Sequence, residues 1–350
     1  MTRIDHRPRR AKAALPAACA SLALAVLAPG ISGAFDAQRE DVAGFVAEMS
    51  NKHGFDAAAL SGVLAQAESR KSILDAMSRP AEKTLTWQEY RERFITERRV
   101  SRGVDTYRDH EPALEKAATS GVPPQYILGI VGVETFYGEN TGRNRVLDAL
   151  ATLAFDYPPR APFFRSELEQ FLLMAREESL DPLAPLGSYA GAMGIPQFMP
   201  SSFRKFAVDG DGDGHRDLWA DWPDVFSSVG NYLKEHGWKA GEPVMAAADV
   251  AGADLAGLDL SKPTLTETVA SLRRRGLKFD AGLPDDAPAM LVALSRPFGT
   301  EYRVGFANFY AITRYNRSLL YASAVNDLAE AIEAAHVRSM PPDDDASFAE

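Results

Sequence analysis

Glu134 follows an apolar run at residues 127–133 and stands in the sequence ILGIVGVETFYG. A carboxylate carried by such a run can be held in low dielectric, where the ionised form is disfavoured and the pKa rises. A general acid that works near neutral pH needs such a raised pKa. The alternative is an ordinary glutamate that faces water from the last turns of an amphipathic helix, because carboxylates are mostly exposed. Glu134 is therefore a candidate proton donor whose role depends on the rest of the chain.

A second group of acidic residues alternates with glycine. Asp209, Asp211 and Asp213 stand at positions 1, 3 and 5 of the segment DGDGDGHRD, with glycine at position 6 and Asp217 at position 9. Such alternating oxygens form the first half of an EF-hand loop, where they converge on Ca²⁺ and the glycine makes the sharp turn. Ca²⁺ is preferred over Mg²⁺ because the ligands are numerous, oxygen-only and flexible. The segment predicts a structural calcium site.

The second half of this segment departs from the EF-hand pattern. Position 12 is Ala220, where an EF-hand has a bidentate glutamate, so a further carboxylate must come from elsewhere. Asp224, at the start of the next predicted helix, is the best candidate. The alternative is a solvated acidic turn without an ion. Three aspartates in strict alternation repel one another unless a cation compensates their charge, which favours the metal site.

A third segment, residues 187–200, is rich in small residues and has the sequence GSYAGAMGIPQFMP. Small residues let backbone amides approach a ligand closely, while Ser188, Tyr189 and Gln197 offer hydrogen-bonding groups and a ring that suit sugars. By itself the segment is equally consistent with a flexible loop.

Periodic apolar residues predict the helices that must position these groups. One helix starts at Pro123 and Pro124, where proline suits the first turn, and runs through Glu134 to a stop near Gly138. Two glycines inside it, at positions 129 and 132, each cost about 1 kcal/mol relative to alanine, so close approach of another helix or a ligand would explain them. Further helices are predicted at residues 42–49, 60–67, 86–95, 163–177, 224–237 and 318–335, with a short one at 202–206 inside a loop region at 182–217.

The character of the chain changes between residues 246 and 314. Apolar segments at 289–294 and 302–306 are typical of strands, a helix is predicted at 265–274, and glycine and proline separate these elements. We expect a small mixed α/β insertion here.

The first 34 residues are typical of a secretory signal, with cationic residues up to Lys12, an apolar stretch at 13–28 and a small-residue cleavage site ending at Ala34. A retained membrane anchor is disfavoured because the stretch falls short of about 20 residues and contains Pro16. Removing this segment takes away five Lys or Arg and one Asp, which changes the net charge from −10 to −14. Such acidity argues against nucleic acid or anionic membranes as partners. The only cysteine, Cys19, lies in the removed segment, so the mature chain forms no disulfide.

Several longer motifs resemble one known family. They are VETFYG at 133–138, DYP at 156–158, the loop at 188–202, the acidic loop that begins at Asp209, SVGNYL at 228–233, and AITRYN at 311–316 followed by Tyr321. Together they cover nearly the whole mature chain and are similar to the membrane-bound lytic murein transglycosylase B family, glycoside hydrolase family 103.

This resemblance implies a set of site residues, with Glu134 as the catalytic glutamate. It assigns the glycan groove to Arg160, Ser188, Gln197, Tyr232, Tyr315, Asn316 and Tyr321. It assigns Ca²⁺ ligation to Asp209, Asp211, Asp213, the carbonyl of His215, and Asp224. One residue is inserted between Trp219 and Asp224 relative to the family spacing, which leaves Asp221 as a rival for the last ligand. The family has two arginines after its Tyr-Pro pair, and here only Arg160 can fill that cationic position.

The family architecture agrees with the organisation inferred from the pattern of apolar residues. We predict an α+β, mainly α fold with a lysozyme-like helical catalytic core, an N-terminal helical region and a small α/β insertion. The predicted parts are a signal peptide at 1–34, the N-terminal helical region at 35–112, the catalytic core with its EF-hand-like loop at 113–245, the insertion at 246–313, a C-terminal helix at 314–338 that packs back on the helical part, and an acidic disordered tail at 339–350.

The resemblance further implies a lyase that acts on peptidoglycan glycan strands in the periplasm of a Gram-negative type cell envelope. Glu134 would protonate the oxygen between N-acetylmuramic acid and N-acetylglucosamine and then, as a base, take the proton of the sugar's C6 hydroxyl while a 1,6-anhydro ring closes. The chemistry would need no cofactor, and Ca²⁺ would be structural. We expect a monomer without a membrane anchor after cleavage, with cell-wall synthesis or hydrolysis proteins as candidate partners.

A single catalytic carboxylate points to assistance by the substrate's own acetamido group, because ordinary glycosidases use two carboxylates. Glu139 is five residues on, about 140° around a helix, and is a poor second carboxylate. Two rival functions stay open. One is a hydrolytic muramidase, in which water attacks, and the other is a non-catalytic, calcium-stabilised glycan-binding protein.

Overall fold

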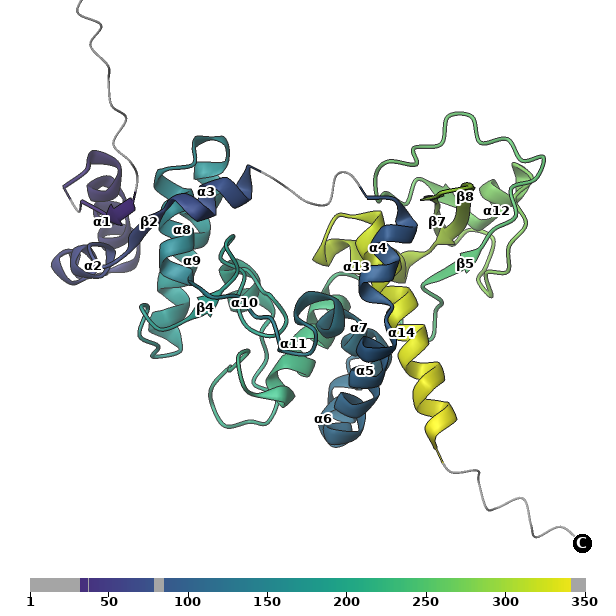
Figure 1. The fold of residues 1–350 in the computed structure, drawn as a ribbon, viewed down its shortest axis with the longest axis horizontal. Helices are drawn as coiled ribbons and strands as arrows, with labels where there is room; N and C mark the ends of the chain where they lie inside the picture. The colour runs from purple at the N-terminus through teal and green to yellow at the C-terminus, as the bar shows by residue number, and fades with distance from the viewer. Residues whose placement is uncertain (1–31, 37, 79–84, 341–350) are drawn as a thin grey trace, which may run out of the picture. The chain divides into compact units, whose positions relative to one another are not determined.

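The computed structural model describes residues 32–36, 38–78 and 85–340. Of the leader predicted at 1–34, residues 1–31 lie outside the described residues, whereas Ser32–Ala34 form a strand. Of the tail predicted at 339–350, residues 341–350 lie outside them. The described chain is mainly helical, with small antiparallel sheets, which confirms the predicted fold class (Figure 1). Within these ranges, no helix combines the length and the apolarity that crossing a bilayer requires.

The elements follow one another in a simple order. The first half contains β1 (Ser32–Ala34), α1 (Glu40–His53), α2 (Ala57–Leu64), β2 (Glu68–Arg70), α3 (Lys71–Met77), α4 (Trp87–Phe94), α5 (Glu97–Asp109), α6 (Glu111–Ala118), α7 (Pro124–Thr135), β3 (Asn144–Arg145), α8 (Val146–Phe155), the 3₁₀ helix η2 (Pro158–Arg160) and α9 (Ala161–Glu177). The second half contains β4 (Leu186–Gly187), α10 (Pro200–Phe206), α11 (Trp222–Glu235), β5 (Met245–Ala247), β6 (Glu267–Thr268), α12 (Val269–Arg274), β7 (Pro288–Arg296), β8 (Gly299–Gly305), α13 (Ala307–Tyr315) and α14 (Leu319–Ser339).

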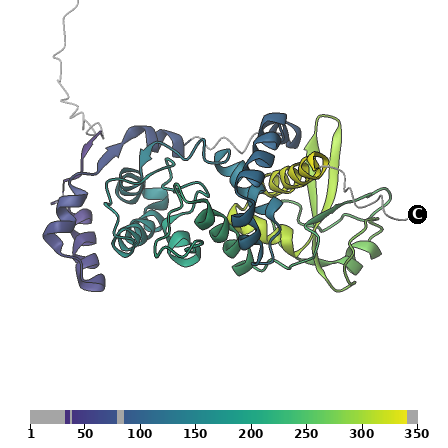
Figure 2. The same ribbon diagram turned by 90° about the horizontal axis from the view of Figure 1, so that it is seen from below.

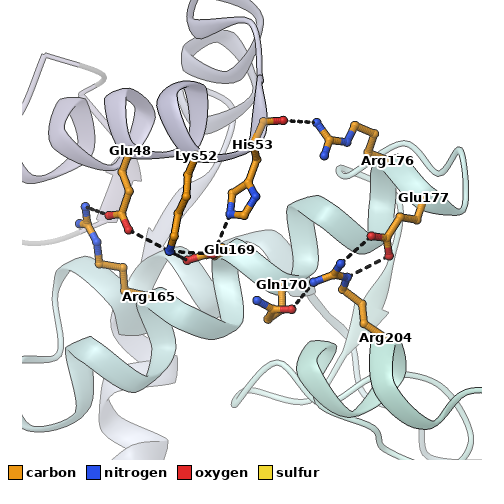
Figure 3. Close-up of polar contacts among 9 residues, drawn as sticks. All are labelled: Glu48, Lys52, His53, Arg165, Glu169, Gln170, Arg176, Glu177 and Arg204. Atoms are coloured by element: carbon orange, nitrogen blue, oxygen red, sulfur yellow. Dashed lines mark hydrogen bonds and ion pairs between the residues drawn. The ribbon is translucent and has the colours of Figure 1, made fainter.

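The N-terminal helices pack on α8 and α9. Strand β2 and helix α3 contact α8, and the apolar residues of α1 join the same core as those of α8 and α9. Ion pairs also link α1 to α9, among them Lys52 with Glu169 at 3.2 Å and Glu48 with Arg165 at 3.4 Å (Figure 3). Asp56 caps α2 by accepting an amide hydrogen at 2.7 Å, as an N-cap aspartate does. This region therefore forms part of the main hydrophobic core.

Helix α7 lies inside the helical part and contacts α5, α6, α11 and α14 (Figure 1). Its two glycines explain how closely it is packed. A Cβ added at Gly129 would lie 2.9 Å from the carbonyl oxygen of Val325 in α14, and one added at Gly132 would lie 2.6 Å from the hydroxyl oxygen of Tyr137. The predicted close approach of another helix is confirmed, and that helix is α14.

The insertion is built on a four-stranded antiparallel sheet in the order β5-β8-β7-β6. Strands β7 and β8 form a hairpin (Figure 2). Strand β7 contacts α4, and β8 contacts α13. Strand β7 is buried on both faces. Its residues Met290, Val292 and Leu294 belong to the main core, whereas Ala289 and Leu291 belong to a second core that α12 covers. The sheet is thus joined to the helices through one shared strand.

Several predicted helix boundaries were wrong, and the helix expected at 60–67 lies at Ala57–Leu64. The helix expected at 265–274 begins only at Val269, because Glu267 and Thr268 pair with β7 and Thr268 caps the helix. The helix expected from Asp224 begins at Trp222, because Asp221 is its N-cap and Pro223 suits its first turn. The last helix continues to Ser339, four residues beyond the expected end.

Candidate active site

Glu134 is the exception in a helix that is otherwise buried around it. Residues 127–133 and Thr135 are buried, whereas Glu134 is half-buried. The helix ends directly after Thr135, because Phe136 and Tyr137 adopt left-handed backbone angles with φ of 55° and 56°. Such angles stop a helix and are uncommon for bulky side chains. The turn therefore fixes Glu134 in the last turn of an apolar helix, neither fully enclosed nor freely solvated.

The carboxylate of Glu134 is held by a tyrosine. The hydroxyl of Tyr321 donates a hydrogen bond to Oε1 of Glu134 at 2.5 Å. Tyr321 is 2 % exposed and stands in the first turn of α14, where the N-cap Ser318 accepts its amide hydrogen at 3.2 Å. A hydrogen bond to a charged group contributes about 1.5–3 kcal/mol. This bond sets the orientation of the carboxylate.

Two further tyrosines, Tyr232 of α11 and Tyr315 of α13, pack together with ring centroids 4.6 Å apart. Tyr232 donates to a backbone carbonyl at 2.7 Å, and Tyr315 donates to the carbonyl of Pro196 at 2.5 Å. Burial raises the pKa of Tyr232 to about 12. Burial and the nearby charge of Glu134 raise the pKa of both Tyr315 and Tyr321 well above its ordinary value. All three tyrosines are therefore neutral hydrogen-bond donors at physiological pH.

Ser188 and Gln197, two of the predicted glycan ligands, both support the loop between β4 and α10. The side-chain amide of Gln197 donates to the carbonyls of Thr141 at 3.0 Å and Gly194 at 2.9 Å, and Gln197 itself has φ of 52°. The hydroxyl oxygen of Ser188 accepts two amides of its own loop at 3.3 and 3.0 Å. These contacts shape the loop, and the glycan-binding role of both residues stays a prediction.

The other predicted glycan ligands occupy different places. Arg160 ends η2, and its guanidinium lies over the rings of Phe163 and Phe164, 4.5 and 5.1 Å from their centroids. Asn316 is half-buried and directly follows Tyr315 at the end of α13. The structure thus places Tyr232, Tyr315 and Tyr321 near Glu134. It positions Arg160 by contacts with aromatic rings of α9.

Thr135 is a site residue to which the sequence analysis assigned no role. It is 1 % exposed, and its hydroxyl donates to the carbonyl of Ile195 at 2.8 Å while it accepts the amide of Gly138 at 3.0 Å. The amide of Ile195 in turn donates to the carbonyl of Leu218 at 2.7 Å. The sequence gives no sign that Thr135 makes this contact, because its partner is a backbone carbonyl 60 residues away. These bonds tie the end of α7 to the loop at 187–200.

The acidic segment forms a compact loop in which Asp209, Asp211 and Asp213 each place a carboxylate oxygen within 4.8 Å of the others. Backbone amides of the same loop donate to all three carboxylates, and the amide of His215 donates to Asp213 at 2.8 Å. The hydrogen bond from the amide of Gly214 contributes most to lowering the pKa of Asp209 below its ordinary value. Three converging carboxylate oxygens are a donor set that Ca²⁺ prefers, so the residues present fit the predicted ion.

Asp224 and Asp221, the rivals for the last ligand, lie at the start of α11. Asp224 is 2 % exposed, and its two oxygens accept the amides of Gly210 at 2.6 Å and Asp217 at 2.7 Å. Burial raises its pKa despite these bonds. Asp221 is the N-cap and accepts the amide of Asp224 at 3.1 Å. Asp224 therefore binds both ends of the acidic loop, and which residue completes the ligand set stays a prediction.

The mainly helical fold, with a half-buried glutamate at the end of a buried helix, agrees with the predicted lysozyme-like class of proteins. The sequence profile of the family described as "Transglycosylase SLT domain" matches residues 37–330. Membrane-bound lytic murein transglycosylase B of Escherichia coli is 44 % identical over 304 residues, which cover 84 % of this chain and 83 % of that protein. The chain belongs to the transglycosylase SLT domain family.

Solved structures agree with this result. The soluble lytic transglycosylase SltB1 from Pseudomonas aeruginosa is 49 % identical with a TM-score of 0.80, over 84 % of this chain and 99 % of that one. The Escherichia coli lytic transglycosylase Slt35 in complex with calcium is 43 % identical with a TM-score of 0.79, over 88 % and 97 % of the two chains. SltB3 from Pseudomonas aeruginosa, in complex with NAG-anhNAM-pentapeptide, is 29 % identical with a TM-score of 0.71, over 82 % and 77 %.

Proposed function

We propose that this protein is a lytic transglycosylase that cleaves the bond between N-acetylmuramic acid and N-acetylglucosamine in peptidoglycan and leaves 1,6-anhydro ends. The observation that carries the proposal is the hydrogen bond from Tyr321 to Glu134, at the end of a buried helix and beside Tyr232 and Tyr315. The names of the relatives support the activity, and the anhydro-sugar ligand of one of them supports the product.

In the proposed reaction, protonated Glu134 gives its proton to the glycosidic oxygen, and the bond from C1 of the muramoyl residue to that oxygen breaks. The acetamido oxygen of the same residue stabilises the positive charge at C1. The C6 hydroxyl then attacks C1 and loses its proton to ionised Glu134, which restores the acid. Water takes no part. The Tyr321 hydroxyl binds one carboxylate oxygen throughout and so keeps the orientation of the acid fixed.

Substrate assistance replaces the second carboxylate of ordinary glycosidases. Glu139, the next acid along the chain, is exposed and forms an ion pair with Arg98 at 2.8 Å. That contact directs it to the surface and supports the single-acid mechanism. The glycan contacts assigned to Arg160, Ser188, Gln197 and Asn316 belong to the same proposal.

We also propose that Ca²⁺ binds to the acidic loop through Asp209, Asp211, Asp213, the carbonyl of His215, and Asp224. The converging carboxylates and the calcium complex of an Escherichia coli relative support this assignment. The ion would be structural: it would neutralise the loop and hold it against α11. The proposal also includes the predicted boundaries of the parts of the chain and export to the periplasm. It further includes a monomeric state and contacts with other cell-wall proteins.

Product analysis tests the proposed reaction. Purified murein is digested with the protein, and the released sugars are examined by mass spectrometry. We expect muropeptides with anhydro-muramoyl ends, which are lighter by one water than hydrolysis products. Reducing ends in their place would establish a hydrolytic muramidase, and no release at all would favour the non-catalytic glycan-binding protein.

A further inference from the structure

A short chain of hydrogen bonds links the acidic loop to the helix end that carries Glu134. Leu218 directly follows the loop, and its carbonyl accepts the amide of Ile195 at 2.7 Å. The carbonyl of Ile195 accepts the hydroxyl of Thr135 at 2.8 Å. Thr135 is the residue next to Glu134. One peptide segment, at Ile195, is therefore bound by the loop on one side and by the end of α7 on the other.

This link has little room to move. Leu218 is fully buried, Ile195 is 4 % exposed and Thr135 is 1 % exposed, so water does not compete for their hydrogen bonds. Gly194 has φ of 68°, and a Cβ added there would lie 2.4 Å from the carbonyl oxygen of Leu218. The amide of Gly138 donates to the Thr135 hydroxyl at 3.0 Å and fixes it from the other side. A buried acceptor that loses its donor is costly, so the bonds hold these segments together.

We propose that Thr135 is a positioning residue that couples the acidic loop to Glu134. This inference rests on the proposed function, in which Glu134 is the acid and the loop holds a cation. With the carboxylates of Asp209, Asp211 and Asp213 drawn together, the end of the loop at Leu218 is fixed, and the bonds through Ile195 and Thr135 fix the last turn of α7. Coupling between two sites is reciprocal. If the cation raises the affinity for a glycan bound at Glu134 by some factor, the glycan must raise the affinity for the cation by the same factor.

Calcium titration of the cleavage-deficient Glu134→Gln variant tests this coupling. The variant is freed of metal with a chelator, and the dissociation constant for Ca²⁺ is measured by calorimetry with and without a saturating peptide-free tetrasaccharide of alternating N-acetylglucosamine and N-acetylmuramic acid. We expect the tetrasaccharide to lower the Kd for Ca²⁺ by about fivefold or more, the lower end of typical allosteric coupling. An unchanged Kd overturns the proposal, and so does an absence of Ca²⁺ binding.

Substitutions at Thr135, made in the Glu134→Gln background, test the route. Thr135→Val keeps the shape and removes the hydroxyl, and we expect the coupling to fall below about twofold, whereas Thr135→Ser keeps the hydroxyl and restores it. Thr152→Val is the matched control. Thr152 is also buried, and its hydroxyl oxygen accepts the amide hydrogen of Arg70 at 3.0 Å, but it lies in α8 and takes no part in the bonds between Leu218 and Thr135. This control should lower the melting temperature and leave the coupling intact.

Two outcomes separate this inference from the proposed function. Full coupling in Thr135→Val, or equal loss in Thr152→Val, overturns the role of Thr135, while anhydro-muramoyl products from the wild-type protein still support the enzyme. Failure of the wild-type protein to cleave murein overturns the proposed function itself. If Thr135→Val does not fold, the titration of Glu134→Gln and its Thr135→Ser derivative still decides whether the coupling exists and survives with the hydroxyl.

Discussion

Glu134 and the acidic loop use carboxylates in opposite ways. Glu134 is a single, half-buried acid whose oxygen accepts a hydrogen bond from a tyrosine side chain. Asp209, Asp211 and Asp213 are three acids at alternate positions whose oxygens accept backbone amides of their own loop, and two of them are exposed. The first arrangement places one carboxylate among apolar and aromatic groups. The second concentrates negative charge within 4.8 Å.

This difference indicates what each carboxylate can do. A lone acid held by a neutral hydroxyl can lose and regain a proton while its surroundings stay the same, which suits proton transfer. Several ionised acids side by side need a compensating cation, which suits metal binding. The chemistry of a carboxylate in this protein thus depends on its neighbours rather than on its type.

The largest effect should follow from Glu134→Gln, which removes the acidic proton but keeps the size of the side chain. We expect release of soluble muropeptides from murein to fall by about 10²–10⁴, the contribution of a general acid, with little change in melting temperature. Glu139→Gln alters an acid five residues away that pairs with Arg98, and it should keep its activity. An equal loss of muropeptide release in the two variants would contradict the assignment of Glu134 as the catalytic acid.

A smaller effect should follow from Tyr321→Phe, which removes the hydroxyl that orients Glu134. The lost bond to a charged group is worth about 1.5–3 kcal/mol, so kcat/KM should fall by about ten- to a hundredfold. Tyr107→Phe is the control, because Tyr107 stacks on His336 with ring centroids 4.0 Å apart, at another part of α14. Unchanged kcat/KM in Tyr321→Phe would show that the carboxylate is oriented by other contacts.

Chelation should act on the acidic loop and therefore on stability. At a Ca²⁺ concentration about 100 times its Kd, binding would add about 2.7 kcal/mol to the free energy of unfolding. Removing the ion with a chelator should lower the melting temperature by several degrees, roughly 2–4 °C per kcal/mol in a chain of this order of size. The Asp209→Asn, Asp211→Asn double variant should melt at the same temperature with and without chelator. If the chelator leaves the melting temperature of the wild-type protein unchanged, the metal assignment is wrong.

The smallest effect concerns Glu169 of α9, a carboxylate that neither stands alone nor belongs to an acidic cluster. It contacts Lys52 at 3.2 Å and His53 at 2.8 Å (Figure 3). Burial raises the pKa of Glu169, but the hydrogen bonds from His53 and Lys52 together outweigh it and hold the pKa below the ordinary 4.5. A lowered carboxyl pKa stabilises the fold above the ordinary value, and this contribution is lost as the pH falls through the folded value.

Glu169→Gln should therefore cost up to about 1 kcal/mol near neutral pH, as partly exposed ion pairs do, and almost nothing at about pH 3. Urea unfolding at the two pH values measures the difference. Gln170→Ala, a change of the neighbouring residue that contacts Arg204 instead of α1, should show no such pH dependence. A cost that is the same at both pH values would mean that Glu169 acts through packing rather than charge.

The sequence predicted the parts of this protein whose signals are local. Helix α9 was predictable because its apolar residues repeat at helical spacing, and α7 was predictable from the prolines at its start and the apolar run that follows them. The glycines of α7 correctly predicted a close neighbour, although the pattern could not identify α14 as that neighbour.

What escaped prediction depends on contacts between distant segments. Strand β6 exists because Glu267 and Thr268 pair with β7, and two residues are too few to show an alternating pattern. The bond from Thr135 to Ile195 ends on a backbone carbonyl, which any residue would provide. The position of Glu134 at the end of an apolar helix could be predicted, whereas its hydrogen bond with Tyr321 was not, because the family resemblance assigned Tyr321 only to the glycan groove.

Strand β7 has a consequence for protein engineering. Met290, Val292 and Leu294 pack in the main core with the helices, while Ala289 and Leu291 pack in the second core beside the sheet. The strand therefore contributes side chains to both cores. Excising the insertion would expose one side of the helical core to water, and loosening the helices would uncover the sheet. The two should therefore unfold in one cooperative step, and the amides of β7 should be among the last in the chain to exchange with deuterium.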